Sequence, residues 1–528
     1  MFDRRKILMG SGAAALMTLP AMRGWAQASK AKTLKAVVNT DLKILDPVWT
    51  SAYITGRHAL LVYDTLYSLD SKYEPKPQMV ESHTLSPNGL VYTFTLRPNL
   101  LFHDNQPVRA ADCVASIKRW SSRNPTGQML ASVMASLEVI NDRSFRLTLK
   151  EPFGLVLEAL GKAYGAAYIM PERVAKTPAT EQITDPTGSG PFMFKRDEWQ
   201  PGNRAVYVRH PGYVPRSEPP DYMSGGKIAK LDRIEWLYIP DDNTTLSALM
   251  AGEIDYYEAP PLDFIALLKS SPDIQVLNID PLGIQALIRP NTLYPPFDKF
   301  EGRQALLHMV DQKEYMGAVV GNPDLYMPYC GAFFLCHSEN GTEVDAVRKP
   351  DYAKARQLLA SAGYQPGQKI VVLQPTDRPQ YNAATTVLVS SLRKAGVTVD
   401  VQAADWSTIS ARRARRDPPD KGGWNLFITS QGGSETASPV DNFWFNSRCE
   451  RANPGWACDP KLDDLIRAWA REPDRTKRRA MIDGIQRQAY ISVPYVPIGQ
   501  FSQPIAFRKN IKGALVSGQP VYWNIEKT

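Results

Sequence analysis

Two loops of this chain carry residue types that could bind a charged solute. The first loop, residues 375–379, places Arg378 directly before a predicted helix. A guanidinium group makes two parallel hydrogen bonds to a carboxylate, and a helix N-terminus adds partial positive charge. The alternative is that Arg378 pairs with Asp377 or another neighbouring acid at the surface. The loop therefore predicts a carboxylate site, with a surface ion pair as the competing interpretation.

The second loop, residues 431–435, combines backbone amides with one carboxylate. It reads Gln-Gly-Gly-Ser-Glu, so Gly432 and Gly433 leave their N–H groups uncovered by side chains, and Ser434 and Glu435 add polar groups. The loop therefore offers a ligand backbone amides and one carboxylate. A flexible surface loop is the alternative.

Motifs for catalysis are absent from the sequence. There is no G-x-S-x-G, H-E-x-x-H or G-x-x-x-x-G-K-[ST] pattern, and residues 188–190 are too short for a dinucleotide fingerprint. The six histidines form no H-x-x-x-H pair, the spacing of a helical zinc site. We therefore expect no catalytic residue, metal or cofactor, with a secreted hydrolase as a remote alternative.

The cysteines suggest local disulfides, because two pairs each bracket a short segment. One alternative is a metal site that includes Cys336 and His337. Cys113 lies in a helical pattern, where we expect a small buried apolar side chain rather than a reactive thiol. The expected pairs are Cys330 with Cys336 and Cys449 with Cys458.

The N-terminus reads as an export signal over residues 1–28. Charged residues 3–6 include a pair of arginines, an apolar stretch follows over 7–19, and Ala-Gln-Ala at 26–28 is a typical cleavage site. The arginine pair is similar to a twin-arginine signal. The apolar stretch is shorter than the about 20 residues that span a membrane. We expect a periplasmic mature chain that begins near Ser29, without a lipid anchor.

Charge gives no reason to expect a nucleic-acid partner. The formal net charge of the 528 residues is +8, and part of it belongs to the signal. The one basic cluster, residues 412–416, is read as the solvated end of a helix, because helix C-termini favour cations.

Alternating strands and helices in the second half of the chain must position the two candidate loops. We predict strands at 369–374, 397–401 and 424–429, with helices at 381–394 and 406–416 between them. Right-handed crossovers make such strands parallel, so the loops after the first and last strands emerge at the same edge. Ligands of open α/β sheets bind at that edge.

The N-terminal half follows a different pattern. Residues 91–96 and 144–150 alternate as strands, and a helix is predicted over 109–120 between them. Two alternating strands with an intervening helix indicate a mixed α+β insert rather than a repeated strand-helix-strand unit.

Several segments, in the right order from about residue 33 to the C-terminus, resemble the family 5 solute-binding proteins of ABC importers, which include dipeptide- and oligopeptide-binding proteins. The longest is Ser-Pro-Asn-Gly-Leu-Val-Tyr-Thr-Phe-Thr-Leu-Arg-Pro-Asn. The segments are 86–99, 102–108, 110–116, 188–192, 295–297, 303–306 with Asp311, 449–458 and 462–465.

The resemblance implies an α/β, two-lobed, periplasmic-binding-protein-like fold with an extra α+β subdomain inserted in lobe I. The two chain crossings are expected near 289–291 and 497–501. Lobe I would then comprise residues 29–290 and 498–528, with the inserted subdomain at 66–187, and lobe II residues 291–497.

The resemblance also implies roles for individual residues. In dipeptide-binding relatives an arginine in an R-P-x-N loop holds the peptide carboxylate, and Asp377–Asn382 is similar to that loop, so Arg378 takes this role. An aspartate that binds the peptide amine in a W-x-G-D loop is missing here, and Glu435 stands in its place. First-lobe contacts are expected at Thr50, Ser51 and Tyr53.

The function implied is a monomeric receptor that captures a short peptide or peptide-like carboxylate and delivers it to an ABC importer permease. The altered amine-binding loop keeps a second hypothesis open, in which the same class of receptor takes another solute: glutathione, a sugar conjugate, a metal chelate or haem.

Overall fold

The computed structural model describes residues 32–528. The predicted signal peptide and its cleavage site lie outside the described residues. Within them, no helix combines the length and the apolar character needed to cross a membrane.

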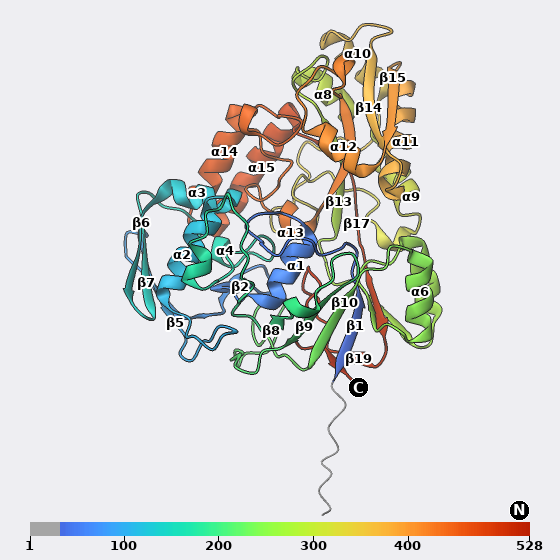
Figure 1. The fold of residues 1–528 in the computed structure, drawn as a ribbon. Coiled ribbons are helices and arrows are strands. Elements are labelled where there is room, and N and C mark those ends of the chain that lie inside the picture. Colours follow the sequence, from blue (N-terminus) through green and yellow to red (C-terminus); the bar gives the residue numbers. More distant parts are fainter. Residues whose placement is uncertain (1–31) are drawn as a thin grey trace, which may run out of the picture. The chain divides into compact units, whose positions relative to one another are not determined.

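The first lobe is built on a seven-stranded sheet with the strand order β12-β18-β11-β1-β10-β9-β8 (Figure 1). The central strand β1 pairs in parallel with both β10 and β11. Strand β18, from near the C-terminus, fits between β11 and β12, so residues from both ends of the chain complete this sheet. Its strands are β1 (Thr33–Val37), β8 (Phe192–Phe194), β9 (Arg204–Arg209), β10 (Arg233–Leu237), β11 (Tyr256–Tyr257), β12 (Ile274–Leu277) and β18 (Ile505–Arg508).

The second lobe has a five-stranded sheet with the order β15-β14-β16-β13-β17. β14 pairs in parallel with both β15 and β16, which confirms the predicted strand-helix alternation and places the ends of β14 and β16 at one edge. β13 is antiparallel to both of its neighbours. The strands are β13 (Ile284–Pro290), β14 (Lys369–Pro375), β15 (Thr398–Ala404), β16 (Leu426–Gly432) and β17 (Val496–Phe501).

The inserted subdomain contains a four-stranded antiparallel sheet with the order β4-β5-β7-β6. The chain leaves the first lobe after Thr65 and returns at Tyr168, and these two residues form a β-bridge. The insert predicted from the sequence begins at the same place, residue 66, but ends later, at residue 187 instead of 167. The elements are β2 (Tyr67–Leu69), β3 (Pro75–Pro77), β4 (Val80–Leu85), β5 (Val91–Leu96), α2 (Ala110–Ser121), α3 (Pro125–Val133), β6 (Met134–Asn141), β7 (Ser144–Leu149) and α4 (Val156–Leu160).

The sheets place the two chain crossings differently from the sequence prediction. β13 and β17 both belong to the second sheet, although the sequence assigned 284–290 and 498–501 to lobe I. The chain passes between the sheets at residues 278–283 and 502–504 instead. The apolar run of β13 fits a buried strand of either lobe, so its composition could not reveal which sheet it joins.

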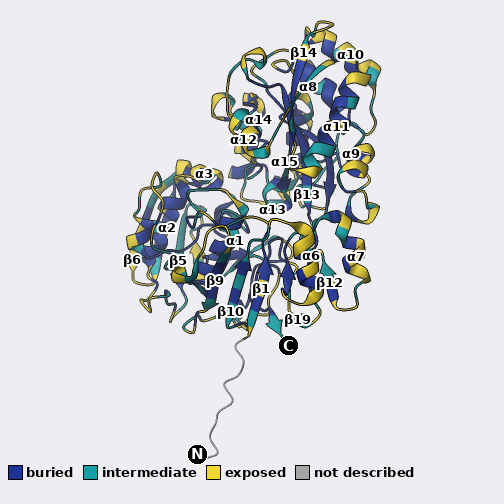
Figure 2. Ribbon diagram, turned by 45° about the vertical axis from the view of Figure 1, so that its right-hand side comes forward, coloured by how far each residue is buried: buried dark blue, intermediate teal, exposed yellow. Residues whose placement is uncertain are grey.

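Helices cover both sheets with their buried faces inward and their exposed faces toward solvent (Figure 2). Six of them begin at an aspartate whose side chain accepts a backbone N–H of the first turn, which satisfies donors that have no partner within the helix. These six are α6 (Asp242–Ala251), α9 (Gln312–Val319), α10 (Tyr352–Ser361), α12 (Trp406–Arg413), α14 (Pro460–Arg471) and α15 (Arg475–Ser492). The other helices outside the inserted subdomain are α1 (Tyr53–Val62), α5 (Glu172–Ala175), α7 (Ile265–Ser270), α8 (Phe300–Leu307), α11 (Pro379–Lys394) and α13 (Gly433–Thr436).

The cysteine predictions are confirmed. Cys330 is bonded to Cys336, Cys449 is bonded to Cys458, and Cys113 is a buried free thiol on α2.

The basic cluster at 412–416 is only partly the solvated helix end that was expected. The guanidinium of Arg413 lies over Trp406, Phe427 and Trp444, and Arg412 donates to the carbonyls of residues 422 and 423. Part of the cluster thus stabilises the second lobe internally.

Candidate ligand-binding site

Helices α1 and α13 meet where the two lobes face each other, near the centre of Figure 1. The Tyr53 hydroxyl, on the first turn of α1, donates to Glu435 Oε2 at 2.5 Å. The backbone N–H of Gly432 donates to the same tyrosine oxygen at 3.1 Å. Residues that the sequence assigned to opposite sides of a ligand are therefore in direct contact.

Burial controls the protonation of this contact. Removal from water raises the pKa of Glu435 to about 7, while the hydrogen bond from Tyr53 and the charge of Lys162 act in the opposite direction. The pKa of Tyr53 lies well above its ordinary value, because of burial and then the neighbouring charge of Glu435. Tyr53 is therefore a hydrogen-bond donor, and Glu435 changes its charge near neutral pH.

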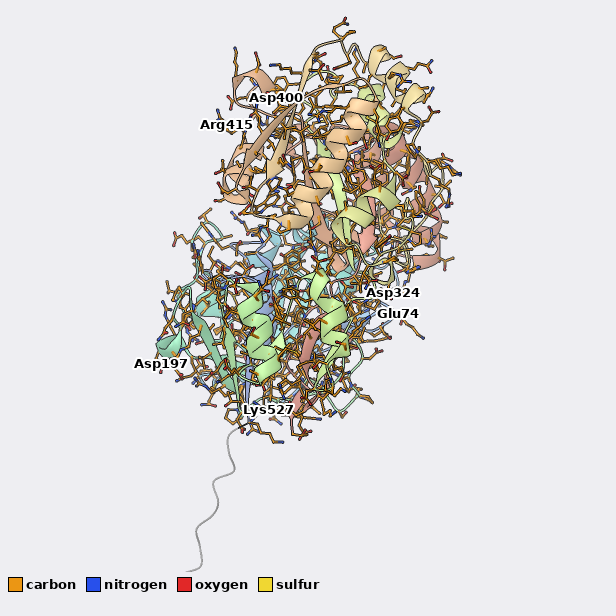
Figure 3. The ribbon with its side chains drawn as sticks, turned by 90° about the vertical axis from the view of Figure 1, so that its right-hand side faces the viewer. Glu74, Asp197, Asp324, Asp400, Arg415 and Lys527 are labelled. Atoms are coloured by element: carbon orange, nitrogen blue, oxygen red, sulfur yellow. A yellow bond between two sulfur atoms is a disulfide. The ribbon has the colours of Figure 1, made fainter. Side chains whose placement is uncertain are left out.

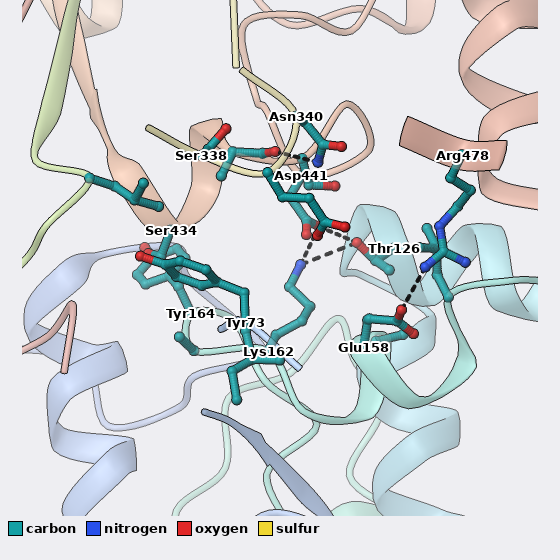
Figure 4. Close-up of a pocket in the computed structure, with 18 of the residues that line it drawn as sticks. Tyr73, Thr126, Glu158, Lys162, Tyr164, Ser338, Asn340, Ser434, Asp441 and Arg478 are labelled. Carbon is teal, nitrogen blue, oxygen red and sulfur yellow. Dashed lines mark hydrogen bonds and ion pairs between the residues drawn. The ribbon is translucent and has the colours of Figure 1, made fainter. Parts of the chain in front are cut away.

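A second contact between the lobes involves Lys162, Asp441 and Thr126 (Figure 4). Lys162, from the inserted subdomain, forms an ion pair with Asp441 of the second lobe, and its side chain is 13% exposed. Thr126 donates to the same carboxylate and accepts a hydrogen bond of 3.1 Å from Lys162. Each charge is neutralised by its partner, which is the condition for burying ions at low cost.

Two cavities adjoin these contacts. The larger one, here called the cleft cavity, has a volume of about 430 Å³ and is lined by residues of the first lobe, the inserted subdomain and the second lobe. A smaller inner cavity of about 130 Å³ shares with it a wall of four residues, Lys162, Tyr164, Ser434 and Asp441. Ligand pockets commonly measure roughly 300 to 1,000 Å³, so the cleft cavity is large enough for a small solute.

Two buried side-chain atoms in the lining of the cleft cavity have no hydrogen-bond partner among residues 32–528. Gln431 is 5% exposed, and its Oε1 accepts no hydrogen bond. Ser434 Oγ is buried and equally unpartnered. Because buried polar atoms are almost always hydrogen-bonded, both are positioned to bond a ligand or water in the cleft cavity.

The loop around Gly433 requires a glycine for packing. A Cβ atom at this position would lie 2.4 Å from Leu282 Cβ and 2.9 Å from the carbonyl oxygen of Gly283. The Gly433 N–H also donates to that oxygen, at 2.7 Å. The glycine thus allows α13 to pack against the first chain crossing, which positions Glu435.

The structure brings most of the predicted site residues together. Thr50, Ser51, Ser434 and Glu435 line the cleft cavity, and Tyr53 and Gly432 form the adjoining contact. The Ser51 carbonyl accepts a hydrogen bond from the Tyr164 hydroxyl.

Arg378 lies outside the lining of both cavities. It is exposed at the N-terminus of α11, at the same sheet edge as Gly432, and within the described part of the chain its side chain has no hydrogen bond or ion pair. The competing surface pair with Asp377 is therefore not formed, because the Asp377 carboxylate accepts the N–H of Trp406 instead.

Sequence reasoning missed several charged groups of the cleft. Lys162, Asp441, Arg123, Arg448 and Arg451 line the cleft cavity and were not singled out. The predicted Cys449–Cys458 bridge was the one available signal, because it encloses Arg451 and adjoins Arg448.

A third set of contacts joins the inserted subdomain to helices α14 and α15. Arg475 pairs with Glu74 at 3.0 Å and Arg478 with Glu158 at 2.8 Å. Glu74 lies at the level where the two lobes meet in Figure 3. Apolar side chains of the subdomain and of both helices belong to one continuous buried cluster, so these elements form an extensive interface.

Metal-ligating residue types are not clustered in the described part of the chain. No group of three or more histidine, cysteine or acidic side chains within residues 32–528 could hold a metal ion. The cleft instead offers acids, bases, hydroxyls and an amide from both lobes.

Comparison with known proteins places these features in context. Residues 74–454 match the family described as bacterial extracellular solute-binding proteins, family 5. A probable peptide ABC transporter periplasmic-binding protein of Sinorhizobium fredii is 38% identical over 523 residues, 98% of either chain.

Solved structures show the same fold at lower identity. A dipeptide-binding protein of Pseudoalteromonas in complex with Met-Leu aligns with a TM-score of 0.77 and 20% identity, over 94% of this chain and all of the other. A periplasmic binding protein of A. tumefaciens R10 in complex with agropinic acid aligns with a TM-score of 0.76 and 22% identity, over 94% and 99%. Both confirm the expected two-lobed α/β architecture.

Proposed function

The chain belongs to the bacterial extracellular solute-binding proteins of family 5, and we propose that it captures a short peptide or peptide-like carboxylate for an ABC importer. The relative of Sinorhizobium fredii, a probable peptide-binding protein of such a transporter, supports the peptide as ligand. The proposal includes a periplasmic location, release from a twin-arginine signal near Ala28, and action as a monomer that docks on a membrane permease.

The observation that carries this proposal is the cleft cavity with walls from both lobes. Its lining combines hydrogen-bonding groups that have no partner, Gln431 and Ser434, with the carboxylates of Glu435 and Asp441. A peptide has N–H and C=O groups along its length and opposite charges at its ends, which matches such a lining.

We propose that Glu435 and Asp441 attract the ligand's amino group. Both carboxylates line the cleft cavity from the second lobe, and the resemblance places Glu435 where an amine-binding aspartate is expected. With a pKa of about 7, Glu435 is about half ionised at neutral pH, and a ligand cation beside it should lower this pKa and favour the ionised form.

Arg378 remains a candidate for a carboxylate on a part of the ligand that lies outside the cleft cavity. Its guanidinium is free to bind, and its place at the edge of the second sheet suits a ligand that extends beyond the cleft cavity. Arg378→Ala should then weaken a carboxylate ligand by roughly 2 to 5 kcal/mol if the contact is desolvated. Unchanged affinity, measured by calorimetry, would remove Arg378 from the site.

A thermal-shift screen of residues 29–528 against di-, tri- and tetrapeptides tests the function. A ligand at 100 times its Kd should stabilise the protein by about 2.7 kcal/mol. No stabilisation by any peptide, together with stabilisation by another solute class, would contradict the peptide as ligand.

A non-peptide solute is the second candidate, because the protein with agropinic acid shares this fold and the expected amine-binding aspartate is missing here. Glutathione, a sugar conjugate, a metal chelate or haem belongs to this class. Mass spectrometry of solute retained through gentle purification would distinguish the two candidates.

A further inference from the structure

Three arginines that line the cleft cavity have no acidic partner among the described residues. They are Arg123, Arg448 and Arg451, and all three are exposed. They come from two sides of the cavity, because Arg123 follows α2 of the inserted subdomain whereas Arg448 and Arg451 belong to the second lobe.

Arg123 is held in place by an aromatic side chain of the first lobe. Its guanidinium carbon lies 5.5 Å from the centre of the Trp49 ring, and its Nη2 donates to the Trp49 carbonyl at 3.3 Å. Trp49 itself lines the cleft cavity. The stacked arrangement positions the charge and leaves further N–H groups of the guanidinium free for a ligand.

The other two arginines are fixed by the second disulfide. Arg448 and Arg451 lie on either side of Cys449, and the Arg451 N–H donates to the Arg448 carbonyl at 3.2 Å. Cys449 is bonded to Cys458, and Arg448 forms a β-bridge with Cys458. The only side-chain bond of Arg448 within the described residues is to Asn446, at 3.1 Å.

Other arginines at the junction of the lobes are neutralised. Arg471, Arg475 and Arg478 each form an ion pair with a glutamate of the inserted subdomain region. The lining of the cleft cavity holds four cationic side chains, the three arginines and Lys162, against two carboxylates, Glu435 and Asp441. The three arginines thus leave the cavity with an excess of positive charge.

We propose that Arg123, Arg448 and Arg451 form an anion subsite that binds a carboxylate of the solute. This inference rests on the proposed function, that the chain is a receptor for a solute, and it adds the chemical class of the ligand. Like charges on opposite sides repel each other as the lobes approach, and an anion between them turns this repulsion into attraction. An anionic ligand therefore favours the closed arrangement over the open one.

The test compares two probes that differ in one charge, trialanine and trialanine amide. Calorimetry with residues 29–528 should show that the free acid binds at least 10-fold more tightly than the amide. Arg448→Gln and Arg451→Gln should each weaken the free acid roughly 10- to 100-fold and leave the amide unchanged. Higher salt should weaken the free acid more than the amide, because the amide has lost the charge that the arginines attract.

Arg393→Gln is the matched control. Arg393 is an exposed arginine on α11, has no ion pair among the described residues and lies outside both cavities. Its substitution removes one positive charge at a distance from the cleft and should change neither affinity. Because the three subsite arginines are exposed, their glutamine variants should retain wild-type circular dichroism and thermal stability.

A second probe separates this proposal from the peptide function. Citrate should stabilise the wild type, and Arg393→Gln, more than it stabilises a variant with Arg123, Arg448 and Arg451 all changed to glutamine. If trialanine fails to bind and citrate shows this dependence, the peptide function falls and the anion subsite stands. Equal affinity for trialanine and its amide, or citrate stabilisation that is absent or unaffected by the three substitutions, would overturn the subsite.

Discussion

Replacing Glu435 with glutamine should stabilise the folded chain at pH 8 and have little effect at pH 5. Burial raises the pKa of this carboxyl from an ordinary value near 4.5 to about 7, so the folded state holds its proton more strongly than the unfolded state does. Between about pH 4.5 and 7 the folded wild type therefore loses stability as pH rises, and above pH 7 the loss is complete. Glutamine carries no proton and avoids this loss.

The size of the effect follows from the pKa difference. The difference between a pKa of 4.5 and one of about 7 corresponds to a loss of about 3 kcal/mol in the free energy of unfolding, at about 1.36 kcal/mol for each pH unit. Because Glu435 is only partly buried, solvent screening reduces this to about 2 kcal/mol. Glutamine also keeps an oxygen that can accept the Tyr53 hydroxyl, so the hydrogen bond between the lobes is retained.

Urea unfolding at pH 5, 6, 7 and 8, followed by tryptophan fluorescence, measures the effect as a difference between variant and wild type. Asp280, at the first chain crossing, also has a pKa raised to about 7 by burial. Its contribution to the pH dependence is the same in both proteins and therefore cancels in the difference. A difference that grows from near zero at pH 5 to about 2 kcal/mol at pH 8 is expected. A difference that stays constant over this range would refute the reasoning.

Tyr53→Phe provides a complementary measurement of the same group. The hydrogen bond from Tyr53 lowers the pKa of Glu435, so its removal should move the titration of Glu435 to higher pH. If the Glu435 titration did not move, the Tyr53–Glu435 contact would not exist in solution.

Three further variants test the packing and the covalent support of the site. Gly433→Ala should destabilise the chain by about 1–3 kcal/mol in urea unfolding, because the new methyl group would collide with residues 282–283. Gly484→Ala is the control: it lies in the middle of α15, its new methyl group contacts no other atom, and it should stabilise the chain by about 0.5–1 kcal/mol. Equal effects of the two would contradict the close approach at α13. Changing both Cys449 and Cys458 to serine should lower the free energy of unfolding by about 2–3 kcal/mol. It should also weaken the binding of carboxylate ligands in calorimetry. Unchanged affinity would mean that the disulfide does not position the cleft arginines.

Much of the second lobe could be predicted from local sequence patterns. The strand and helix periods over 369–429 matched β14, α11, β15, α12 and β16 closely, because helices and strands there alternate with clear turn residues between them. The boundaries of the lobes were predicted less well. Strand β13 pairs with β16, about 140 residues later, and only such distant pairing reveals its sheet.

The residues of the candidate site could likewise be predicted only in part. Tyr53 was named from the resemblance to a family and Glu435 from its loop as well as the resemblance, and the two side chains are in contact. Lys162 and Asp441 could not be found, because a single lysine or aspartate has no signal that separates a buried pair from the surface. Arg378 was chosen from its local helix start, whereas the cleft cavity is formed by tertiary packing.

The central claim is that a solute binds between the lobes. Calorimetric titration of residues 29–528 with a short peptide tests this claim by comparing the wild type with Ser434→Trp. Ser434 lines both cavities, so tryptophan should fill the cleft and abolish binding, whereas Ser407→Trp on the exposed face of α12 should leave it intact. The account predicts one peptide per chain for the wild type and for Ser407→Trp, and none for Ser434→Trp. Peptide binding of equal strength in a folded Ser434→Trp protein would contradict it.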